Sequence, residues 1–540
     1  MTSPPPTTAR PRRVRAVGDR ALLVECADLA DVLALHAALT AASLPGLVDA
    51  VAAARTVLVR AADRASRDRI ARALPDLPAA RRHDAARGLV TIDTVYDGED
   101  LAAVAALTGQ SRDAVVAAHA GQVWRAAFGG FAPGFTYLLG AGLDVPRRAS
   151  PRTVVPAGAV ALAGEFSAVY PRASPGGWQL IGRTDAPLWD LERDPPALVR
   201  PGDGVRFRAV RERVAATGAP RRPAVGPAPE SAGSPPPDLP YGALLVLAAG
   251  PLSLLEDLGR PGRADLGVSP SGAVDRGSAR QANRLVGNDR SAAVVETVLG
   301  GLELRAHGTQ VVAVSGAPAP LTVLDGDGEP RGHPPTDAPF ALRDGEVLRL
   351  GTPPYGLRSY VALRGGLAVP PVLGSRSTDV LAGLGPAPLA AGTLLPVGAP
   401  PRAAVGLPEP GRVREGGLTR VTVLPGPRAD WLTEGSLDRL GRREWVVTDR
   451  SNRVGLRLDG PPLVRAVETE LPSEGAVAGA VQVPADGRPV LFLADHPVTG
   501  GYPVVAVVRD ADLDALAQVR PGERVRLGLA RQAAARHPGV

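Results

Sequence analysis

A proline-rich stretch divides the chain into two parts. Residues 219–240 read APRRPAVGPAPESAGSPPPDLP and hold eight prolines in 22 positions. Such a stretch cannot build a hydrophobic core, so it predicts an extended linker. It separates a front part of roughly 210 residues from a back part of roughly 300. A chain of 540 residues also exceeds what one core can organise, and we therefore expect several domains.

Frequent turns favour short strands over long helices. The chain contains 63 Gly and 56 Pro, which predicts a mostly β protein. The exception lies near the N-terminus, where the apolar runs 20–26 and 54–61 flank an Ala/Leu-rich segment at 29–42. This pattern predicts two strands around one helix, a small α/β unit. Two short helices, each closed by Gly, are expected between residues 99 and 121.

One pattern occurs in both parts. Residues 170–184 (YPRASPGGWQLIGRT) and 495–508 (DHPVTGGYPVVAVV) each place Gly-Gly and an aromatic residue before an apolar strand. Similar closing turns follow, RPGDGVRF at 200–207 and RPGERVRL at 520–527. We infer one β-rich unit used at least twice, although similar turn chemistry alone would give the same short repeat.

Composition excludes several functions. Lysine is absent, so a Walker lysine, a Schiff base and a biotin attachment site are excluded, and every side-chain cation is Arg or His⁺. The net charge of +6 is spread among interspersed acids, and the second short helix offers only Arg112, so we expect no nucleic-acid binding. A single cysteine, Cys26, excludes internal disulfides and fits a reducing cytoplasm. Apolar runs stay well below the ~20 residues of a membrane span.

Aromatic residues gather around a Pro-Gly turn. The chain has 7 Phe, 7 Tyr and 5 Trp, yet residues 124–137 contain five of them. Pro133-Gly134 suits the central positions of a type II turn, with Phe131 and Phe135 beside it and Tyr137 on the following strand. The cluster forms either a hydrophobic corner or the wall of a pocket. His119 is the nearest titratable residue before it, and its role is either structural or catalytic.

Three polar loops are candidates for binding anions. Asp275 is expected to cap a helix that Gly287 ends, and the preceding SPSG turn, which includes Ser271, could receive an anion or simply begin the helix. The loops 374–379 (GSRSTD) and 451–458 (SNRVGLRL) each hold an Arg among small polar residues. They suit carboxylate or phosphate, and equally their own backbone. The seven histidines are scattered, so no metal site is predicted.

These stretches resemble, in order, a known pair of bacterial proteins. GDRALLVE, AAHAGQVWRAAFGGFAPGFTYLLG, PRRASPRTVVPAGAVALAG and YPRASPGGWQLIGRT resemble the B subunit of prokaryotic 5-oxoprolinase, the KipI-type family. LLEDLGRPGRADLGVSPSGAVDRGSARQANRLVGN, GSRSTD, SNRVGLRLDG, SEGAVAGAVQVP and ADHPVTGGYP resemble its C subunit, the KipA-type family. The linker would then join two usually separate subunits.

The resemblance implies a fold and its boundaries: a small α/β domain followed by three β-rich, cyclophilin-like barrel domains. We expect a disordered tail at 1–11, the α/β domain at 12–85, a barrel at 86–213, the linker at 214–240, a first β-rich domain of the C module at 241–405 and a second at 406–535.

The resemblance also implies an activity, the ATP-dependent opening of 5-oxoproline to glutamate. The B and C subunits would use ATP, with Mg²⁺, to activate the lactam carbonyl, and a separate A subunit of the LamB/YcsF type would complete ring opening. The expected catalytic residues are His119, Arg453 and Asp495. Expected substrate or ATP contacts are Phe131, Pro133, Gly134, Phe135, Tyr137, Gly176, Gly177, Trp178, Asp257, Ser271, Asp275, Arg376, Asp379, Arg457, Gly500, Gly501 and Tyr502.

Within that set, phosphate would be held by Arg376, Arg453 or Arg457. Mg²⁺ would be held by a carboxylate such as Asp257, Asp379 or Asp495. One departure from the family is Trp124, where the family usually has Tyr, so a role there that needs a hydroxyl is in doubt.

Two alternatives remain open. The same modules occur in urea carboxylase as the carboxyltransferase, which would need a biotin carrier on another chain. KipI-type and KipA-type proteins also regulate a histidine kinase without catalysis, although one chain holding both inhibitor and antagonist makes a switch awkward. The protein is expected to be cytoplasmic, and its oligomeric state is open.

Overall fold

The computed structural model describes residues 12–77, 88–148, 150, 152–211, 239–413 and 415–530. The expected tail at 1–11 lies outside this range, as does the expected linker at 214–240 except for its last two residues. Among the described residues, strand residues clearly outnumber helical residues, which confirms the predicted mostly β fold class. Within them, no helix is both long and apolar enough to cross a membrane.

The N-terminal domain is the predicted α/β unit. Its sheet has the order β1-β2-β4-β3, and two helices lie on it. The predicted helix at 29–42 is confirmed and is capped by Asp28, whose carboxylate accepts from the Asp31 N–H. The elements are β1 (Arg13–Val17), β2 (Ala21–Glu25), α1 (Leu29–Ala42), β3 (Leu47–Ala52), β4 (Thr56–Ala61), α2 (Arg64–Ala73) and the 3₁₀ turn η1 (Leu74–Asp76).

The second domain is a seven-stranded sheet of order β12-β9-β10-β7-β6-β13-β5. A bridge between Val95 and Arg183 joins its two edges, so the sheet curls nearly shut. Helices α3 (Leu101–Thr108) and α4 (Arg112–Ala120) confirm the predicted pair. The strands are β5 (Leu89–Thr94), β6 (Trp124–Gly129), β7 (Thr136–Leu139), β8 (Arg152–Val155), β9 (Ala159–Ala163), β10 (Phe166–Val169), β11 (Ser174–Gly176), β12 (Gln179–Arg183) and β13 (Gly204–Ala209). We call this domain the front barrel.

The third domain has two sheets, of orders β20-β19-β22-β17-β14-β24 and β15-β16-β23-β18-β21. Side chains from both sheets share one core, so we call it the sandwich. Helix α5 (Arg276–Leu285) is capped by Asp275 as predicted. The strands are β14 (Ala243–Ala249), β15 (Leu252–Glu256), β16 (Val294–Val298), β17 (Leu302–His307), β18 (Gln310–Gly316), β19 (Leu321–Leu324), β20 (Pro330–Gly332), β21 (Pro339–Leu342), β22 (Val347–Leu350), β23 (Arg358–Leu363) and β24 (Leu394–Pro396), with the 3₁₀ turn η2 (Ala264–Leu266).

The last domain is a closed barrel of order β25-β32-β29-β30-β27-β26-β33, which we call the back barrel. Its strands are β25 (Leu418–Pro425), β26 (Glu444–Val447), β27 (Gly455–Asp459), β28 (Glu474–Gly475), β29 (Ala480–Gln482), β30 (Val490–Phe492), β31 (Thr499–Gly500), β32 (Val504–Val508) and β33 (Arg524–Leu529). Its helices are α6 (Glu434–Arg442) and α7 (Leu513–Leu516), with 3₁₀ turns η3 (Ala429–Trp431) and η4 (Asp510–Asp512).

The two barrels repeat one topology. Read from β32, the back barrel runs β32-β29-β30-β27-β26-β33-β25, which matches the front barrel's order strand for strand. In each, one parallel pair interrupts an antiparallel sheet, β13 with β5 and β33 with β25. The buried indoles also correspond: Trp124 donates to the His119 carbonyl at 2.9 Å, and Trp445 donates to the Leu440 carbonyl at 3.1 Å. The inferred repeat is therefore a repeated domain.

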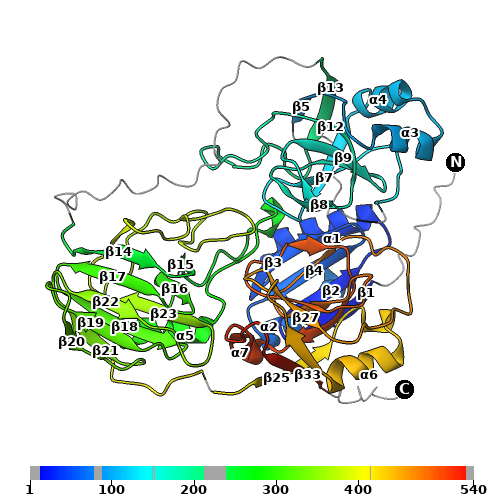
Figure 1. Ribbon diagram of the computed structural model, residues 1–540. Helices are drawn as coiled ribbons and strands as arrows, with labels where there is room; N and C mark the ends of the chain where they lie inside the picture. The colour runs from blue at the N-terminus through cyan, green and yellow to red at the C-terminus, as the bar shows by residue number, and fades with distance from the viewer. Residues whose placement is uncertain are drawn as a thin grey trace.

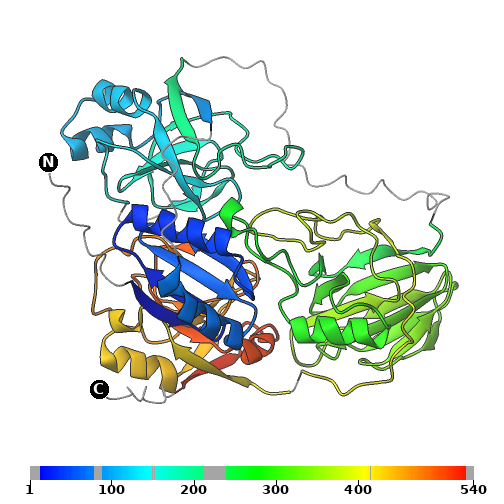
Figure 2. The ribbon, with the colours of Figure 1, turned by 180° about the vertical axis from the view of Figure 1, so that it is seen from behind.

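The front and back parts of the chain pack directly against each other. Apolar residues of the N-terminal sheet, such as Leu23 and Leu58, share a core with Val477 and Val507 of the back barrel. Both ribbon views show the blue N-terminal domain against the orange and red back barrel, with the green sandwich to one side (Figures 1 and 2). Arg428 of the back barrel pairs with Glu25 across this interface at 2.5 Å, and with Glu474 of its own barrel.

Candidate functional site

The Pro-Gly turn joins β6 to β7 and has the predicted geometry. Gly134 has a positive φ of 76°, and the Phe135 N–H donates to the Ala132 carbonyl at 3.0 Å, as a type II turn requires. Phe131 also has a positive φ of 59°, which is unfavourable for a bulky residue. Strain of this kind is held in place only by surrounding contacts, and it is concentrated at functional sites.

Those contacts come from the back part of the chain. The Phe131 N–H donates to Thr499 Oγ1 at 2.9 Å, and the Gly134 N–H donates to the Leu266 carbonyl at 3.2 Å. The Tyr137 hydroxyl lies 3.1 Å from Ser473 Oγ. The turn is therefore clamped between the sandwich and the back barrel. We call this meeting place the junction.

The predicted aromatic residues form the front side of the junction. Phe135 contacts Tyr170 and Trp178 edge to face, with ring centroids 5.2 and 5.5 Å apart. Tyr137 contacts Trp178 at 5.4 Å, and Phe131 contacts Tyr170 at 6.2 Å. Apart from Phe131, these rings are buried. The structure thus brings together the predicted residues Phe131, Pro133, Gly134, Phe135, Tyr137, Gly176, Gly177 and Trp178.

Arg453 occupies the equivalent loop of the back barrel, between β26 and β27, and its surroundings differ from the prediction. We expected Arg453 to be catalytic and to hold phosphate, and a side chain that is only 2% exposed argues against direct contact with a ligand. Its Nε lies 3.0 Å from Asp495 Oδ2 and its Nη2 lies 3.1 Å from Glu256 Oε1. Its Nη1 donates to Glu296, and Nη2 also donates to the Gly272 carbonyl at 2.8 Å. The guanidinium is already surrounded by acceptors.

This charge cluster joins the back barrel to the sandwich. Burial disfavours the Arg453 cation, but Asp495, Glu256 and Glu296 hold its pKa well above the ordinary value. Burial raises the pKa of Glu256 well above its ordinary value, against the opposing effect of Arg453. For Glu296, Arg453 and Arg358 overcome burial and lower the pKa. Of the two glutamates, Glu256 therefore holds a proton more readily than Glu296.

Asp495 and Ser271 meet in the same cluster. Ser271 has a positive φ of 53° and is fully buried, and its hydroxyl donates to Asp495 Oδ1 at 2.6 Å. Asp495 also accepts from the Val380 N–H at 3.1 Å. Tyr360 connects Asp275 to this cluster. Its hydroxyl accepts a hydrogen bond from the Asp275 N–H and donates one to Glu296. Burial, with Asp514, raises the pKa of Asp275 to about 6.

Asp257 braces the 374–379 loop. Its carboxylate accepts from the hydroxyls of Ser375 and Ser377 and from the N–H groups of Gly259 and Arg376, all within 2.6–2.7 Å. The Arg376 guanidinium donates to the Val369 carbonyl at 2.6 Å. Both predicted residues are thus bonded within the sandwich itself, Asp257 to the 374–379 loop and the Arg376 guanidinium to Val369, which favours the structural alternative for GSRSTD.

Asp379 lies between two arginines at the edge of that loop. Burial, together with Asp495, raises its pKa to about 6. Arg260 and Arg172 both interact electrostatically with Asp379, and each has a buried Nη1 without a hydrogen-bond partner in the described part of the chain. Arg172 belongs to the front barrel, whereas Asp379 and Arg260 belong to the sandwich. The front barrel and the sandwich therefore approach each other around Asp379, where two guanidinium N–H groups have no hydrogen-bond partner among the described residues.

His119 does not reach the junction. It is fully buried, and its ring nitrogens bond Tyr96 Oη at 2.7 Å and Ser167 Oγ at 2.9 Å. Burial lowers its pKa to about 3. Its place corresponds to Leu440 in the repeat, a core position. This geometry favours the structural alternative, and the catalytic role stays a prediction without support from the contacts.

Four other predicted residues divide into two groups. Gly500 and Gly501 line the junction beside Ser473, with β31 paired to β28. Tyr502 is 41% exposed at the edge of this loop. Arg457 is exposed on β27, four residues after Arg453, and does not join the other predicted residues.

The carboxylates expected to hold Mg²⁺ do not fit that ion. Asp257 and Asp495 already accept hydrogen bonds on both oxygens. Mg²⁺ needs oxygen ligands in near-octahedral arrangement. Within the described ranges, no group of three His, Cys, Asp or Glu residues could hold a metal ion.

Sequence reasoning missed residues in three places: Arg147, Ser473 and Thr499 at the junction, Glu256 and Glu296 in the Arg453 cluster, and Arg172 and Arg260 beside Asp379. Most lie in stretches that carry the family resemblance, such as PRRASPR and LLEDLGRPGR. Their positions in those stretches were the available signal. Their role depends on contacts between segments far apart in the sequence, which no local pattern reveals.

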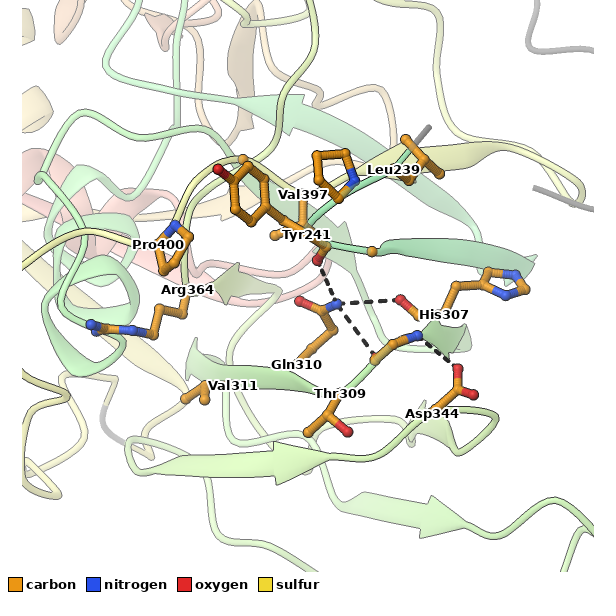
Figure 3. A pocket seen from close by; sticks show the side chains of 14 residues that line it. Leu239, Tyr241, His307, Thr309, Gln310, Val311, Asp344, Arg364, Val397 and Pro400 are labelled. Carbon is orange, nitrogen blue, oxygen red and sulfur yellow. Dashed lines mark hydrogen bonds between the residues drawn. The ribbon is translucent and has the colours of Figure 1, made fainter. Parts of the chain in front are cut away.

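A cavity of about 770 Å³ lies elsewhere, at the edge of the sandwich (Figure 3). Its polar groups already bond one another: Gln310 Nε2 donates to the Tyr241 carbonyl at 3.0 Å, and the Gly308 N–H donates to Asp344 at 2.7 Å. None of the predicted site residues lines it. The cavity is separate from the junction.

Two family models match the chain. The model "Carboxyltransferase domain, subdomain C and D" matches residues 12–199, and "Carboxyltransferase domain, subdomain A and B" matches residues 266–529. The back part is 36% identical to the 5-oxoprolinase C subunit of Escherichia coli K12 over 285 residues, 52% of this chain and 89% of that protein. The front part is 50% identical to the 5-oxoprolinase B subunit of Escherichia coli O157:H7 over 130 residues, 23% of this chain and 60% of that protein.

A solved structure spans both parts. The crystal structure of TTHA0988 is 36% identical, with a TM-score of 0.79, and the match covers 95% of this chain and all of the other. Two β-barrels of one topology, meeting at a shared junction, thus define a carboxyltransferase-type protein. The chain belongs to the family of the 5-oxoprolinase B and C subunits, with a B-type module followed by a C-type module.

Proposed function

We propose that this chain is the fused B and C component of an ATP-dependent 5-oxoprolinase, a hydrolase that acts on a cyclic amide. The observation that carries the proposal is the junction. The strained turn of the B-type module is held by Thr499 and Ser473 of the C-type module. Each module alone has half of this site. The identities with the B and C subunits of 5-oxoprolinase support the same assignment.

Hydrolysis of 5-oxoproline requires activation of its lactam carbonyl, which is a poor electrophile. A lactam carbonyl resists attack by water, and transfer of the ATP γ-phosphoryl group to its oxygen would make the carbon reactive. Phosphoryl transfer needs positioning and charge neutralisation more than covalent help from the protein. In a chain without lysine, guanidinium and backbone N–H groups must supply those contacts. Arg172 and Arg260, beside Asp379, each have one such buried donor without a partner among the described residues.

The buried cluster would support this site without touching substrate. Arg453 holds Asp495, Glu256 and Glu296 together, and Asp495 in turn fixes Ser271 and the Val380 N–H. It therefore sets the shape of the segment that carries Asp379. We assign Arg453 and Asp495 positioning roles. Any Mg²⁺ would arrive with the nucleotide.

Ring opening would be completed by a partner. We propose a separate A-type subunit of the LamB/YcsF kind, and the names of the relatives, which are enzyme subunits, support an assembly of several subunits. This division places activation on the present chain and hydrolysis at the interface with the partner.

Carboxyl transfer is the second candidate, and the name of the matched family favours it. A lysine-free chain cannot carry biotin itself, so a separate carrier would have to deliver the carboxyl group. One parallel experiment separates the two functions. The full chain is mixed either with an A-type protein, ATP and 5-oxoproline, or with a carboxylated biotin carrier and urea. We expect glutamate from the first mixture and no carboxylated urea from the second; the reverse would reject the proposal.

A further inference from the structure

Three arginines lie close together in the segment PRRASPR of the front barrel. Arg148 and Arg152 lie 2.6 and 2.9 Å from Asp100 Oδ1, and Arg152 also pairs with Glu99. Their charges are thus balanced within the domain. Arg147 is different, because it points across the junction and contacts the back barrel.

Arg147 donates one hydrogen bond to a side chain among the described residues, to the neutral Ser473 hydroxyl, which lies 3.1 Å from its Nη2. No carboxylate of the described residues lies within ion-pair distance of it, although acids pair with both neighbouring arginines. The side chain is half-buried, and its Nη1 lies directly over Gly501, against the place that a Cβ would take there. A partly desolvated cation without a counter-charge is costly.

The surroundings of Arg147 suit a small anion. Ser473 Oγ accepts from Arg147 and shares a hydrogen bond with the Tyr137 hydroxyl, which uses one of the two hydroxyl hydrogens, so one further donor remains beside the guanidinium. Tyr137 follows the strained turn that the back barrel clamps. Guanidinium binds carboxylate through two parallel N–H groups, a geometry that a hydroxyl cannot occupy fully.

We infer that Arg147, assisted by Ser473 and Tyr137, binds the carboxylate of the substrate. This contact would make the junction select a carboxylate-bearing lactam over a neutral amide such as urea. The inference rests on the proposed function, which it deepens by naming the group that determines specificity. It also explains why Arg147 alone of the three arginines is left without an acid.

The test compares two lactams and two variants. L-5-oxoproline carries the carboxylate, and 2-pyrrolidinone is the same ring without it. We expect Arg147→Gln to raise the KM for L-5-oxoproline roughly 10- to 100-fold with little change in kcat, and to weaken the binding of 2-pyrrolidinone far less than that of L-5-oxoproline. Arg148→Gln is the matched control, because its partner is Asp100, and its KM should stay near that of the wild type. Arg147→Lys should recover part of the affinity.

Binding measured by calorimetry on the full chain separates this inference from the proposed function. If the wild type releases glutamate but Arg147→Gln binds L-5-oxoproline equally well, the inference is wrong and the function stands. If small carboxylates bind through Arg147 but no glutamate forms with the A-type partner and ATP, the function is wrong and the carboxylate site stands. If the wild type binds no carboxylate, the inference is overturned. Thermal melting of each variant verifies that it is folded.

Discussion

Nη2 of Arg453 in the back barrel lies 3.1 Å from Oε1 of Glu256 in the sandwich, and the two side chains are only 2% and 0% exposed. The two residues are far apart in the sequence and come from different domains. Asp495 and Glu296 complete the group, so one guanidinium neutralises carboxylates from both domains. Arg453 therefore holds the sandwich and the back barrel of the C-type module together.

Replacement of Arg453 by alanine should therefore destabilise the fold. It would leave buried carboxylates without their cation, and breaking a buried ion pair in this way costs about 3–5 kcal/mol. Unfolding by denaturant measures the loss. The matched control is Arg457→Ala, since Arg457 is exposed in the same segment and should change stability by less than about 0.5 kcal/mol. Equal stability of the two variants would contradict the ion cluster described above.

Replacement of His119 by leucine should preserve the activity of each folded molecule. Leucine stands at the corresponding position of the back barrel, whereas a catalytic histidine would be essential. The loss of hydrogen bonds to Tyr96 and Ser167 should cost stability at neutral pH. Steady-state kinetics on the folded fraction gives the answer; turnover that falls by about two orders of magnitude or more would restore the catalytic role.

In the same variant, the free energy of unfolding should depend less on acid pH than in the wild type. The pKa of His119 is about 3 in the folded protein, below its ordinary value of about 6.5. Between these values the unfolded chain binds a proton that the folded chain does not, so acidification destabilises the wild type by about 1.4 kcal/mol per pH unit through this residue. We expect the stability difference between wild type and His119→Leu to shrink as pH falls from about 6.5 toward about 4. A difference that does not change with pH would show that His119 titrates normally.

Replacement of Thr499 by valine should loosen the strained turn. The Phe131 N–H would lose its acceptor, which costs about 1–3 kcal/mol, and the positive φ of Phe131 would lose its support. We expect a higher KM for 5-oxoproline. Thr499→Ser keeps the hydroxyl and should behave like the wild type, so a defect of similar size in both variants would point to lost packing instead.

The sequence predicts the local secondary structure better than it predicts the residues that meet at the candidate site. The helix at 29–42, the Asp275 cap and the Pro133-Gly134 turn depend on neighbouring residues, and each was predictable. The burial of Arg453 depends on Glu256 and Glu296, which local reasoning cannot place beside it. A lone arginine in a polar loop has the same sequence pattern whether it binds a ligand or another domain.

The linker should act only as a tether. The shared apolar core and the pair of Arg428 with Glu25 already join the two modules. We expect residues 1–218 and 241–540, expressed as separate chains, to copurify and to retain near-normal activity. Arg428→Ala should weaken that association. Two folded halves that elute separately would mean that the covalent connection itself is required.

The most direct measurement compares the ADP and glutamate formed from 5-oxoproline by the purified chain with an A-type partner. We predict equal amounts of both products, and neither glutamate nor sustained ADP formation when the partner is omitted. Omission of ATP should also abolish glutamate. Robust glutamate formation by the isolated chain, or formation that does not depend on ATP, would contradict the proposed division of labour.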